Sequence, residues 1–289
     1  MQDFRGRVAA ITGAGSGMGR ALAQQLAQQG CHLALADIDA AGLEDTVRNL
    51  PDGVQVTQHQ VDVGQREAIY AWAEAVRAEH GRLNLLFNNA GVALSGTLRS
   101  SDDANLQWIT NINYWGVVHG CRAFLPLLIE SGEGHIINTS SISGLIAQPG
   151  MGAYNATKFA VRGFSECLRM ELELEQLPVS LTCVHPGGIK TAIAAKSRYD
   201  QSTQALSKKD PDTARADFEK LFITSADDAA RTILKAVRRD RRRVLVGVDA
   251  RVIDWVQRLL PTAYQALIKR LFVKPVSYTH LTLPTIYSV

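Results

Sequence analysis

The stretch RVAAITGAGSGMGRALAQQLAQQG, residues 7–30, decides the fold. Its first six residues form an apolar run that suits a buried strand, and a glycine-rich turn follows at residues 12–19. Leu22 and Leu26 then recur at helical spacing, and Gly30 stands where a helix C-cap belongs. Glycines let backbone amides approach a phosphate, and a helix N-terminus adds partial positive charge. Strand, turn and helix together therefore predict a pyrophosphate-binding turn.

The same alternation of strands and helices continues outward along the chain. Apolar runs predict further strands at residues 31–36, 83–87, 134–141, 179–184 and 244–248, and alternation of apolar and polar residues predicts another at 54–61. Periodic segments predict helices from near residue 40 and over 66–80, 105–129 and 151–175. This pattern predicts a doubly wound parallel α/β sheet, a Rossmann fold, with ligands at the carboxyl ends of the strands. We predict one domain over residues 1–275, with a helical lid over about 191–221.

An acidic residue closes the second predicted strand. Asp37 lies about 20 residues past the glycines, where a carboxylate accepts hydrogen bonds from the adenosine ribose and repels a 2′-phosphate. Ile38 and Asp39 supply no cation to hold that phosphate. The sequence thus favours NAD over NADP. Capping of the helix that begins near residue 40 is an alternative role for Asp37, compatible with ligand binding.

Tyr154 and Lys158 are four residues apart in a predicted helix, so their side chains project from one face. A cation beside a phenol stabilises the phenolate, and we expect it to lower the pKa of Tyr154 toward neutrality. Such a tyrosine can act as a general acid or base. The pair is common in helices when taken alone, and its meaning depends on the motifs around it.

Composition limits the class of protein. With 289 residues, 46% of them hydrophobic and 20% charged, the chain is long enough for a large core. Its four cysteines are widely spaced in apolar runs and are predicted to be reduced and buried. No secretory signal and no run long enough to span a membrane is visible, so we expect a cytoplasmic protein.

Six motifs occur in one order along the chain and resemble the short-chain dehydrogenase/reductase family. They are Thr12-Gly-x-x-x-Gly17-x-Gly19, Asn89-Ala-Gly91, Asn113, Ser141, Tyr154-x-x-x-Lys158 and Pro186-Gly187. The match runs from about residue 5 to about 195, with compatible elements to about 250. The resemblance implies an NAD-dependent oxidoreductase that interconverts a secondary alcohol and a ketone, built as a homodimer or homotetramer.

The resemblance also implies the catalytic roles. Tyr154 exchanges a proton with the substrate oxygen while hydride passes to or from the nicotinamide, and Ser141 hydrogen-bonds that oxygen. Lys158 lowers the pKa of Tyr154 and holds the nicotinamide ribose, and Asn113 anchors a water in a proton relay. Three neighbours compete for the serine and asparagine roles: Ser140, Ser143 and Asn111.

The cofactor residues follow from the same resemblance. The pyrophosphate turn comprises Gly13, Ser16, Gly17, Met18 and Gly19, and the ribose acceptor is Asp37. The adenine contact is Asp62 and Val63, the cleft near the ribose is lined by Asn89, Ala90 and Gly91, and the segment over the nicotinamide holds Pro186, Gly187, Ile189 and Thr191. The phenol and the serine polarise the substrate oxygen, so no metal is expected.

The lid and the C-terminal part leave alternatives open. Ile193, Ala194 and Tyr199 suggest an apolar substrate, or else they pack the lid down. Residues 231–274 carry 12 Lys and Arg against three Asp, and apolar residues recur at helical spacing over about 250–273. These basic helices pack on the sheet or a second subunit, which we favour, or contact an anionic membrane surface. A charge run alone does not indicate nucleic-acid binding.

The last stretch, residues 276–289, lacks charged residues and is rich in Thr, Ser and Tyr. We interpret it as a non-native scar or a flexible extension and exclude it from the fold. Two functions from other classes stay open beside the dehydrogenase: a non-catalytic dinucleotide-binding regulator on the same fold, and a sugar-nucleotide epimerase or dehydratase. The presence of all four catalytic groups disfavours the first, and the glycine spacing disfavours the second.

Overall fold

The computed structural model describes residues 3–200, 202–207, 210, 213, 216 and 220–273. Its centre is a seven-stranded sheet in the order β3-β2-β1-β4-β6-β7-β9, in which every neighbouring pair is parallel. The strands are β1 Val8–Thr12, β2 His32–Asp37, β3 Val56–Gln60, β4 Leu85–Asn88, β6 Gly134–Thr139, β7 Val179–Pro186 and β9 Arg243–Val246. The strand order reverses between β1 and β4, which places a ligand crevice at their carboxyl ends. The predicted doubly wound α/β fold is confirmed.

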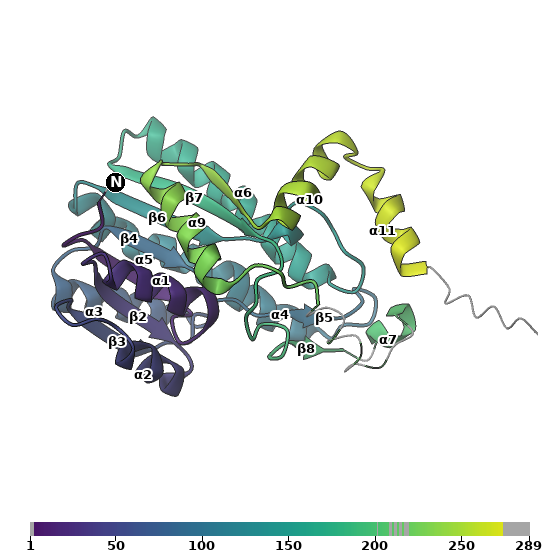
Figure 1. Cartoon of the computed structure of the whole chain (residues 1–289), viewed down its shortest axis with the longest axis horizontal. Coiled ribbons are helices and arrows are strands. Elements are labelled where there is room, and N and C mark those ends of the chain that lie inside the picture. The colour runs from purple at the N-terminus through teal and green to yellow at the C-terminus, as the bar shows by residue number, and fades with distance from the viewer. Residues whose placement is uncertain are drawn as a thin grey trace, which may run out of the picture.

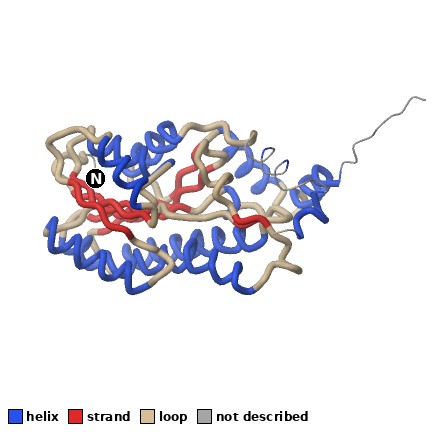
Figure 2. Tube along the Cα trace, turned by 90° about the horizontal axis from the view of Figure 1, so that it is seen from below, coloured by secondary structure: helices blue, strands red, loops and turns tan. Residues whose placement is uncertain are grey.

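Helices cover both faces of this sheet (Figures 1 and 2). One apolar core joins the sheet to α1 Gly17–Ala27, α2 Ala40–Arg48 and α9 Ala226–Arg238. A second core joins the other face to α3 Arg66–His80, α5 Gly116–Glu130 and α6 Gly152–Leu174. Side chains of a strand alternate between faces, and in β1 Ala9 and Ile11 enter the first core while Val8 and Ala10 enter the second. Burial on both faces explains why a central strand such as β1 reads as a continuous apolar run, whereas the edge strand β3 is partly exposed and alternates.

One predicted helix is wrong in its interior. The segment predicted as a single helix over residues 105–129 is α4 Asp103–Thr110, a π-helical turn η1 Asn111–Trp115, and then α5. The amide of Gly116 donates to the carbonyl of Asn111, the i→i+5 bond of a π turn. A Cβ on Gly116 would lie 3.1 Å from the carbonyl oxygen of Val63, so this glycine permits close contact with the end of the third strand unit.

The lid contains a helix, as predicted, and also a short strand that the sequence did not indicate. A two-residue strand, β8 Arg198–Tyr199, pairs in parallel with β5 Leu94–Ser95, and helix α7 Ser202–Ser207 follows it. The guanidinium of Arg198 lies 3.7 Å from the ring centroid of Trp108. This stacking and the strand pair attach the start of the lid to α4 and to the loop after β4.

The C-terminal helices are α10 Val248–Leu259 and α11 Tyr264–Val273, separated at Pro261 (Figure 1). Most of their large apolar residues are exposed, among them Trp255, Leu259 and Leu267. This apolar face does not pack on the sheet, because the buried face of α10 is carried by other residues. Packing on a second subunit, the other form of the favoured prediction, stays a prediction. Residues 276–289 lie outside the described part of the chain.

Two further expectations can be compared with the described residues. Cys31, Cys121 and Cys183 are buried as predicted, but Cys167 is exposed, because it lies on the solvent side of α6. No helix among the described residues is long and apolar enough to cross a bilayer.

Candidate active site

The predicted pyrophosphate turn joins β1 to α1 and requires glycine at several points. Gly13 and Gly17 have φ angles of 68° and 52°, in the left-handed region that glycine favours. A Cβ on Gly19 would lie 2.0 Å from the carbonyl oxygen of Gly13. Ser16 is the N-cap of α1, and its exposed side chain makes no capping hydrogen bond. Together with Met18 in the first turn, these residues leave the N-terminal amides of α1 for an anionic group.

Thr12 fastens this turn to the end of β4. Its hydroxyl oxygen accepts hydrogen bonds from the amides of Asn89 and Ala90, both at 3.0 Å, and the Asn89 side chain donates to the Thr12 carbonyl at 3.0 Å. The Asn89 Oδ1 atom is buried and has no partner among the described residues. A donor from a bound ligand would satisfy it. We assigned Thr12 only to the glycine motif, and no signal in the sequence showed this clamp.

Asp37 lies at the carboxyl end of β2, beside the glycine turn. Its carboxylate accepts hydrogen bonds from the amides of Gly15 at 2.8 Å and Asp39 at 3.0 Å. The helix cap of α2 is instead Asp39, which accepts from Gly42, so the alternative capping role of Asp37 is wrong. The lid brings a cation that the local sequence lacks: Lys196 Nζ lies 3.6 Å from the Asp39 carboxylate.

Asp62 and Val63 follow β3, next along this edge of the sheet. The Asp62 carboxylate accepts from the amide of Gly64 at 2.8 Å, which closes a short turn. The Val63 side chain is buried in the second core and contacts the start of α5. The structure thus places both residues on the Asp37 side of the crevice, since the amide of Val61 donates to the Asp37 carbonyl at 2.9 Å.

Ser141 is distinguished from its neighbours by its contacts. The hydroxyl of Ser140 is buried and donates to the backbone carbonyl of Lys158 at 2.7 Å, so it has a structural role. The Ser141 hydroxyl caps a 3₁₀ turn, η2 Ile142–Gly144, by accepting from the Ser143 amide at 3.1 Å. It also faces Tyr154, and the hydrogen bond between them opposes the rise that burial causes in the tyrosine pKa. Of the three serines, Ser141 is the one that shares a site with the tyrosine.

Tyr154 and Lys158 project from the first turns of α6 as predicted, with Lys158 Nζ 5.7 Å from the centroid of the tyrosine ring. Lys158 is buried and its ammonium donates to the Thr139 carbonyl at 2.9 Å. Burial lowers the pKa of Lys158 to about 8. Burial also raises the pKa of Tyr154, and the hydrogen bond with Ser141 opposes this. The expectation of a lowered tyrosine pKa is thus wrong, because burial of the phenol has the larger effect, and the Lys158 ammonium donates to the Thr139 carbonyl.

Asn113 lies fully buried in the π turn. Its Oδ1 accepts from the Val92 amide at 2.8 Å and its Nδ2 donates to the Val92 carbonyl at 2.9 Å. A Cβ on Gly91 would lie 3.3 Å from Asn113 Oδ1 and 3.5 Å from Lys158 Nζ, so the three residues meet. The competing Asn111 is bound by Gln107 on an exposed surface instead. The Asn113 amide nitrogen also donates to the Thr157 hydroxyl at 3.4 Å, so this side chain ties the loop at Val92 to α6. Its role in anchoring a relay water stays a prediction.

His185 is a buried residue of this site that sequence reasoning missed. Its Nδ1 lies 3.0 Å from the carbonyl oxygen of Ser141, so a protonated Nδ1 holds the backbone of the serine. Burial lowers the pKa of His185 to about 4, which keeps the ring neutral. The contact joins β7 to the end of β6 through tertiary packing, and nothing in the local sequence indicates it.

The segment after β7 returns to the glycine turn. Gly187 and Gly188 are held by the Val246 carbonyl and the Asp249 carboxylate, at 2.9 and 2.6 Å. Thr191 lies over the phosphate side, because a Cβ on Gly17 would be 2.9 Å from its methyl group. The other two predicted site residues of this segment, Pro186 and Ile189, are buried.

The three lid residues that suggested an apolar substrate differ in their burial. Ala194 is fully buried, which favours packing for this residue, whereas Ile193 and Tyr199 are half-buried. The Tyr199 hydroxyl is buried without a partner in the described chain.

Together these contacts form a crevice suited to a dinucleotide. The glycine turn lies at one end, Asp37 beyond it, and Ser141, Tyr154 and Lys158 at the other, all at the carboxyl ends of parallel strands. The uncapped α1 amides and the orphaned Asn89 oxygen fit a phosphate-bearing ligand with hydrogen-bond donors. The described residues contain no cluster of three or more metal-ligating side chains.

Comparison with known proteins agrees with this arrangement. The family model described as short chain dehydrogenase matches residues 7–202. SadH of Mycobacterium tuberculosis is 46% identical over 270 residues, covering 93% of this chain and 96% of its own length.

Two solved structures extend the comparison. A short-chain dehydrogenase/reductase from Burkholderia phymatum in complex with NAD is 32% identical, has a TM-score of 0.82, and the match covers 96% of this chain and 100% of the other. A metagenomic short-chain oxidoreductase in complex with NADP is 29% identical, with a TM-score of 0.66 and coverage of 84% and 97%. The chain therefore belongs to the short-chain dehydrogenase/reductase family of NAD(P)-binding oxidoreductases.

Proposed function

We propose that this protein transfers hydride between NAD(H) and a secondary alcohol or ketone, with Tyr154 as the general acid and base. The observation that carries the proposal is the convergence of Tyr154, Ser141 and Lys158 at the end of a crevice that begins with a phosphate-binding turn. The cofactor, when bound, supplies or accepts the hydride. The remaining steps belong to side chains of this chain.

In ketone reduction, the Tyr154 hydroxyl donates a proton to the substrate oxygen. Its raised pKa keeps the phenol protonated at neutral pH, so it is ready to donate. The Ser141 hydroxyl hydrogen-bonds the same oxygen and stabilises the charge that develops there. Its position is fixed by the amide of Ser143 on one side and His185 under its backbone on the other.

Lys158 completes the proposed proton exchange. With a pKa of about 8 it is largely protonated at neutral pH and stabilises the tyrosinate left after donation. The nearby Asn113 fixes the loop after Asn89-Ala-Gly91 through Val92 and so shapes the wall beside the lysine. In alcohol oxidation the same groups act in reverse, with the tyrosinate as base.

Asp37 supports a preference for NAD over NADP. Two of its lone pairs accept from Gly15 and Asp39, and those left are directed at the ribose region in our proposal. A carboxylate there repels a 2′-phosphate. Lys196 does not compensate, because its ammonium is paired with Asp39.

The apolar character proposed for the substrate comes from the surroundings of the serine and tyrosine. Ala153 and Tyr154 cluster with Leu94 of β5 and Ile109 of α4. A small-molecule alcohol or ketone with an apolar body fits these walls.

The first experiment titrates the purified protein with NADH and NADPH by nicotinamide fluorescence and then adds a panel of ketones and aldehydes. We expect tighter binding of NADH and oxidation of the cofactor by at least one apolar ketone. Tight binding without turnover across a broad panel would favour a non-catalytic dinucleotide-binding regulator. Equal affinity for both cofactors would refute the role of Asp37.

A further inference from the structure

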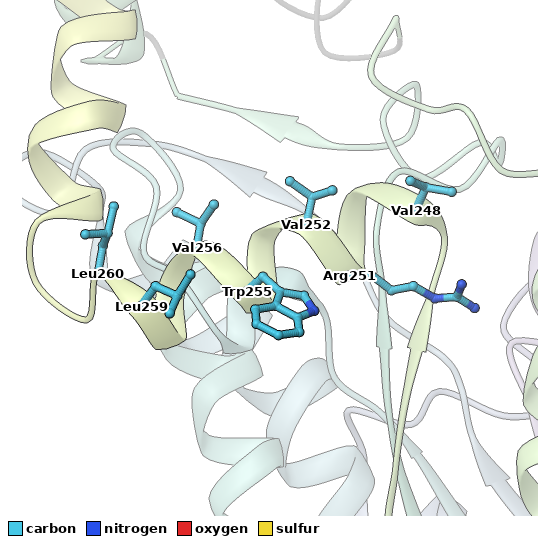
Figure 3. Close-up of a pocket in the computed structure, with 7 residues that line it drawn as sticks. All are labelled: Val248, Arg251, Val252, Trp255, Val256, Leu259 and Leu260. Carbon is cyan, nitrogen blue, oxygen red and sulfur yellow. The ribbon is translucent and has the colours of Figure 1, made fainter.

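Helix α10 carries an exposed apolar stripe on its outer face (Figure 3). Val248, Val252, Trp255 and Leu259 recur every three or four residues, and their exposed fractions are 67%, 55%, 67% and 69%. Together with Val256 they line a shallow apolar groove that no described part of the chain covers. Four large side chains exposed in one row are unusual on a monomer surface and indicate a binding face.

Cations border this stripe, and the acidic residues of the same helix face inward. Arg251 and Arg258 are exposed, and Arg251 lines the groove (Figure 3). Asp254 is buried and pairs with Arg243 and with Arg258, the latter at 3.0 Å. The remaining acid of the helix, Asp249, is half-buried and accepts from Gly188. The outer surface of α10 is therefore positive around an apolar centre.

Helix α11 continues the same chemistry. Leu267 and Leu260 are 44% and 40% exposed, and Lys269 and Arg270 are exposed beside them. The sequence from Val248 to Arg270 contains no acid other than the two inward carboxylates. A tryptophan among aliphatic residues, with arginines at the border, is the composition of a helix that lies in the headgroup region of a bilayer.

We propose that α10 and α11 dock this protein onto the surface of an anionic lipid bilayer. The apolar stripe enters the headgroup and acyl boundary, and the arginines and lysine pair with lipid phosphates. The proposal is independent of catalysis.

A second copy of the chain fits this face less well. At 12 and 10 residues α10 and α11 together extend about 33 Å, and one face of them about 10 Å wide offers on the order of 300 Å². A stable interface needs roughly 800 Å² per partner. A two-fold contact through the stripe would also bring the Arg251 and Arg258 of both copies together, whereas an anionic surface neutralises them.

The docking helices are attached to the walls of the active site. The Tyr264 hydroxyl at the start of α11 accepts from the amide of Ala147, in the loop between Ser141 and Tyr154. The Asp249 carboxylate at the start of α10 holds the amide of Gly188 at 2.6 Å. A bilayer under α10 would thus lie next to the cleft, where a membrane-dissolved apolar substrate can reach it.

The test is flotation of the full chain with phosphatidylcholine vesicles, with and without phosphatidylglycerol. We expect binding to the anionic vesicles, weakened by high salt, and a blue shift of tryptophan emission. Trp255→Ser should abolish the shift and lower binding about tenfold or more, since it removes the centre of the stripe. Leu174→Ser is the matched control, because Leu174 is 82% exposed at the end of α6.

Charge-reversal variants test the electrostatic contribution to vesicle binding separately from the apolar contribution. Arg251→Glu changes the local charge by two and should weaken binding roughly twentyfold. Arg48→Glu makes the same change on α2, at the opposite end of the molecule, and should bind like the unaltered protein (Figure 1). Equal binding to both kinds of vesicle, or unchanged binding by Trp255→Ser, would overturn the proposal. A dimer that Trp255→Ser dissociates, without vesicle binding, would overturn it in favour of a second copy.

Discussion

Burial shifts the pKa values of Tyr154 and Lys158 in opposite directions. It disfavours the charged form of each group, so the pKa of the phenol rises and that of the ammonium falls to about 8. The two pKa values therefore move apart, and the phenol stays protonated to higher pH than the ammonium. This differs from the lowered tyrosine pKa that charge alone predicts.

Replacement of Tyr154 by phenylalanine tests the proposed acid. The change removes the hydroxyl and little volume, so we expect cofactor affinity to stay within about twofold while turnover falls by about 10²–10⁴. Steady-state rates and NADH titration measure the two quantities. Tyr70→Phe on α3 is the control and should retain full activity. Turnover by Tyr154→Phe near that of the unaltered protein would remove Tyr154 from the mechanism.

The pH dependence of ketone reduction reports Lys158. The ammonium is charged below its pKa of about 8 and neutral above it, so the tyrosinate loses its stabilising cation as pH rises. We expect kcat/KM for reduction to fall across about pH 8. Lys158→Arg should move this fall to higher pH, and Lys158→Met should give a low rate that is flat over the same range. A profile of Lys158→Met that still falls near pH 8 would assign the ionisation to another group.

Cofactor choice is best tested with Asp37→Asn. Alanine would also remove the acceptor for the Gly15 amide and loosen the turn for both cofactors, whereas asparagine keeps an oxygen there. We expect the NADH to NADPH preference to decrease about tenfold or more, because the repulsion of a 2′-phosphate is lost. Fluorescence titration of both cofactors measures it. An unchanged preference would mean that the ribose is recognised elsewhere.

At the scale of elements, the sequence predicts strands better than the details between them. The central strands of the sheet follow from apolar runs, because a strand buried on both faces has few other sequences available. The edge strand β3 follows instead from alternation of apolar and polar residues. The π turn could not be predicted. It adds one residue to a helix whose apolar spacing from Leu106 to Ile112 is normal, and only the packing of Gly116 against Val63 reveals it. The β5–β8 pair is too short for a periodic signal.

The π turn gives a matched pair of asparagines for a stability test. Asn113→Ala leaves the buried amide and carbonyl of Val92 without partners, so we expect a loss of about 1–3 kcal/mol in the free energy of unfolding, with reduced turnover. Asn111→Ala alters an exposed contact with Gln107 and should change stability by less than about 0.5 kcal/mol. Urea unfolding of both variants measures the difference. Equal effects would show that the buried amide does not anchor the loop.

For the whole molecule, the candidate site is a consequence of topology. Residues from 12 to 191 meet because parallel strands present their carboxyl ends at one edge of the sheet, so motifs quoted from the sequence could be placed together before any contact was known. Contacts between side chains from segments that are distant in the sequence could not be predicted. His185 under Ser141, Thr12 against Asn89, and Lys196 beside Asp39 each join segments whose order in the chain says nothing of their distance.

Two buried histidines make the stability of the whole fold depend on pH. His135 lies 2.8 Å from the Thr182 hydroxyl and His185 binds the Ser141 carbonyl, and burial lowers their pKa values to about 3 and about 4. The folded state therefore binds fewer protons than the unfolded state below pH 6.5, and stability falls as the pH drops from 6.5 toward 4. Each histidine contributes roughly 2–3 kcal/mol to this loss at pH 4.

Substitutions that keep the hydrogen bonds but cannot titrate should remove the dependence. The Thr182 hydroxyl donates to the Arg241 carbonyl, so His135 donates to it through Nε2, which the amide of glutamine can replace in His135→Gln. Asparagine can likewise replace the Nδ1 donor in His185→Asn. We expect the two variants to have similar urea midpoints at pH 8. Between pH 8 and pH 4.5 the midpoint of each variant should decline less than that of the unaltered protein. A decline as steep as that of the unaltered protein would place the acid-sensitive groups elsewhere, among the paired carboxylates such as Asp240, whose pKa Arg169 holds low against the effect of burial.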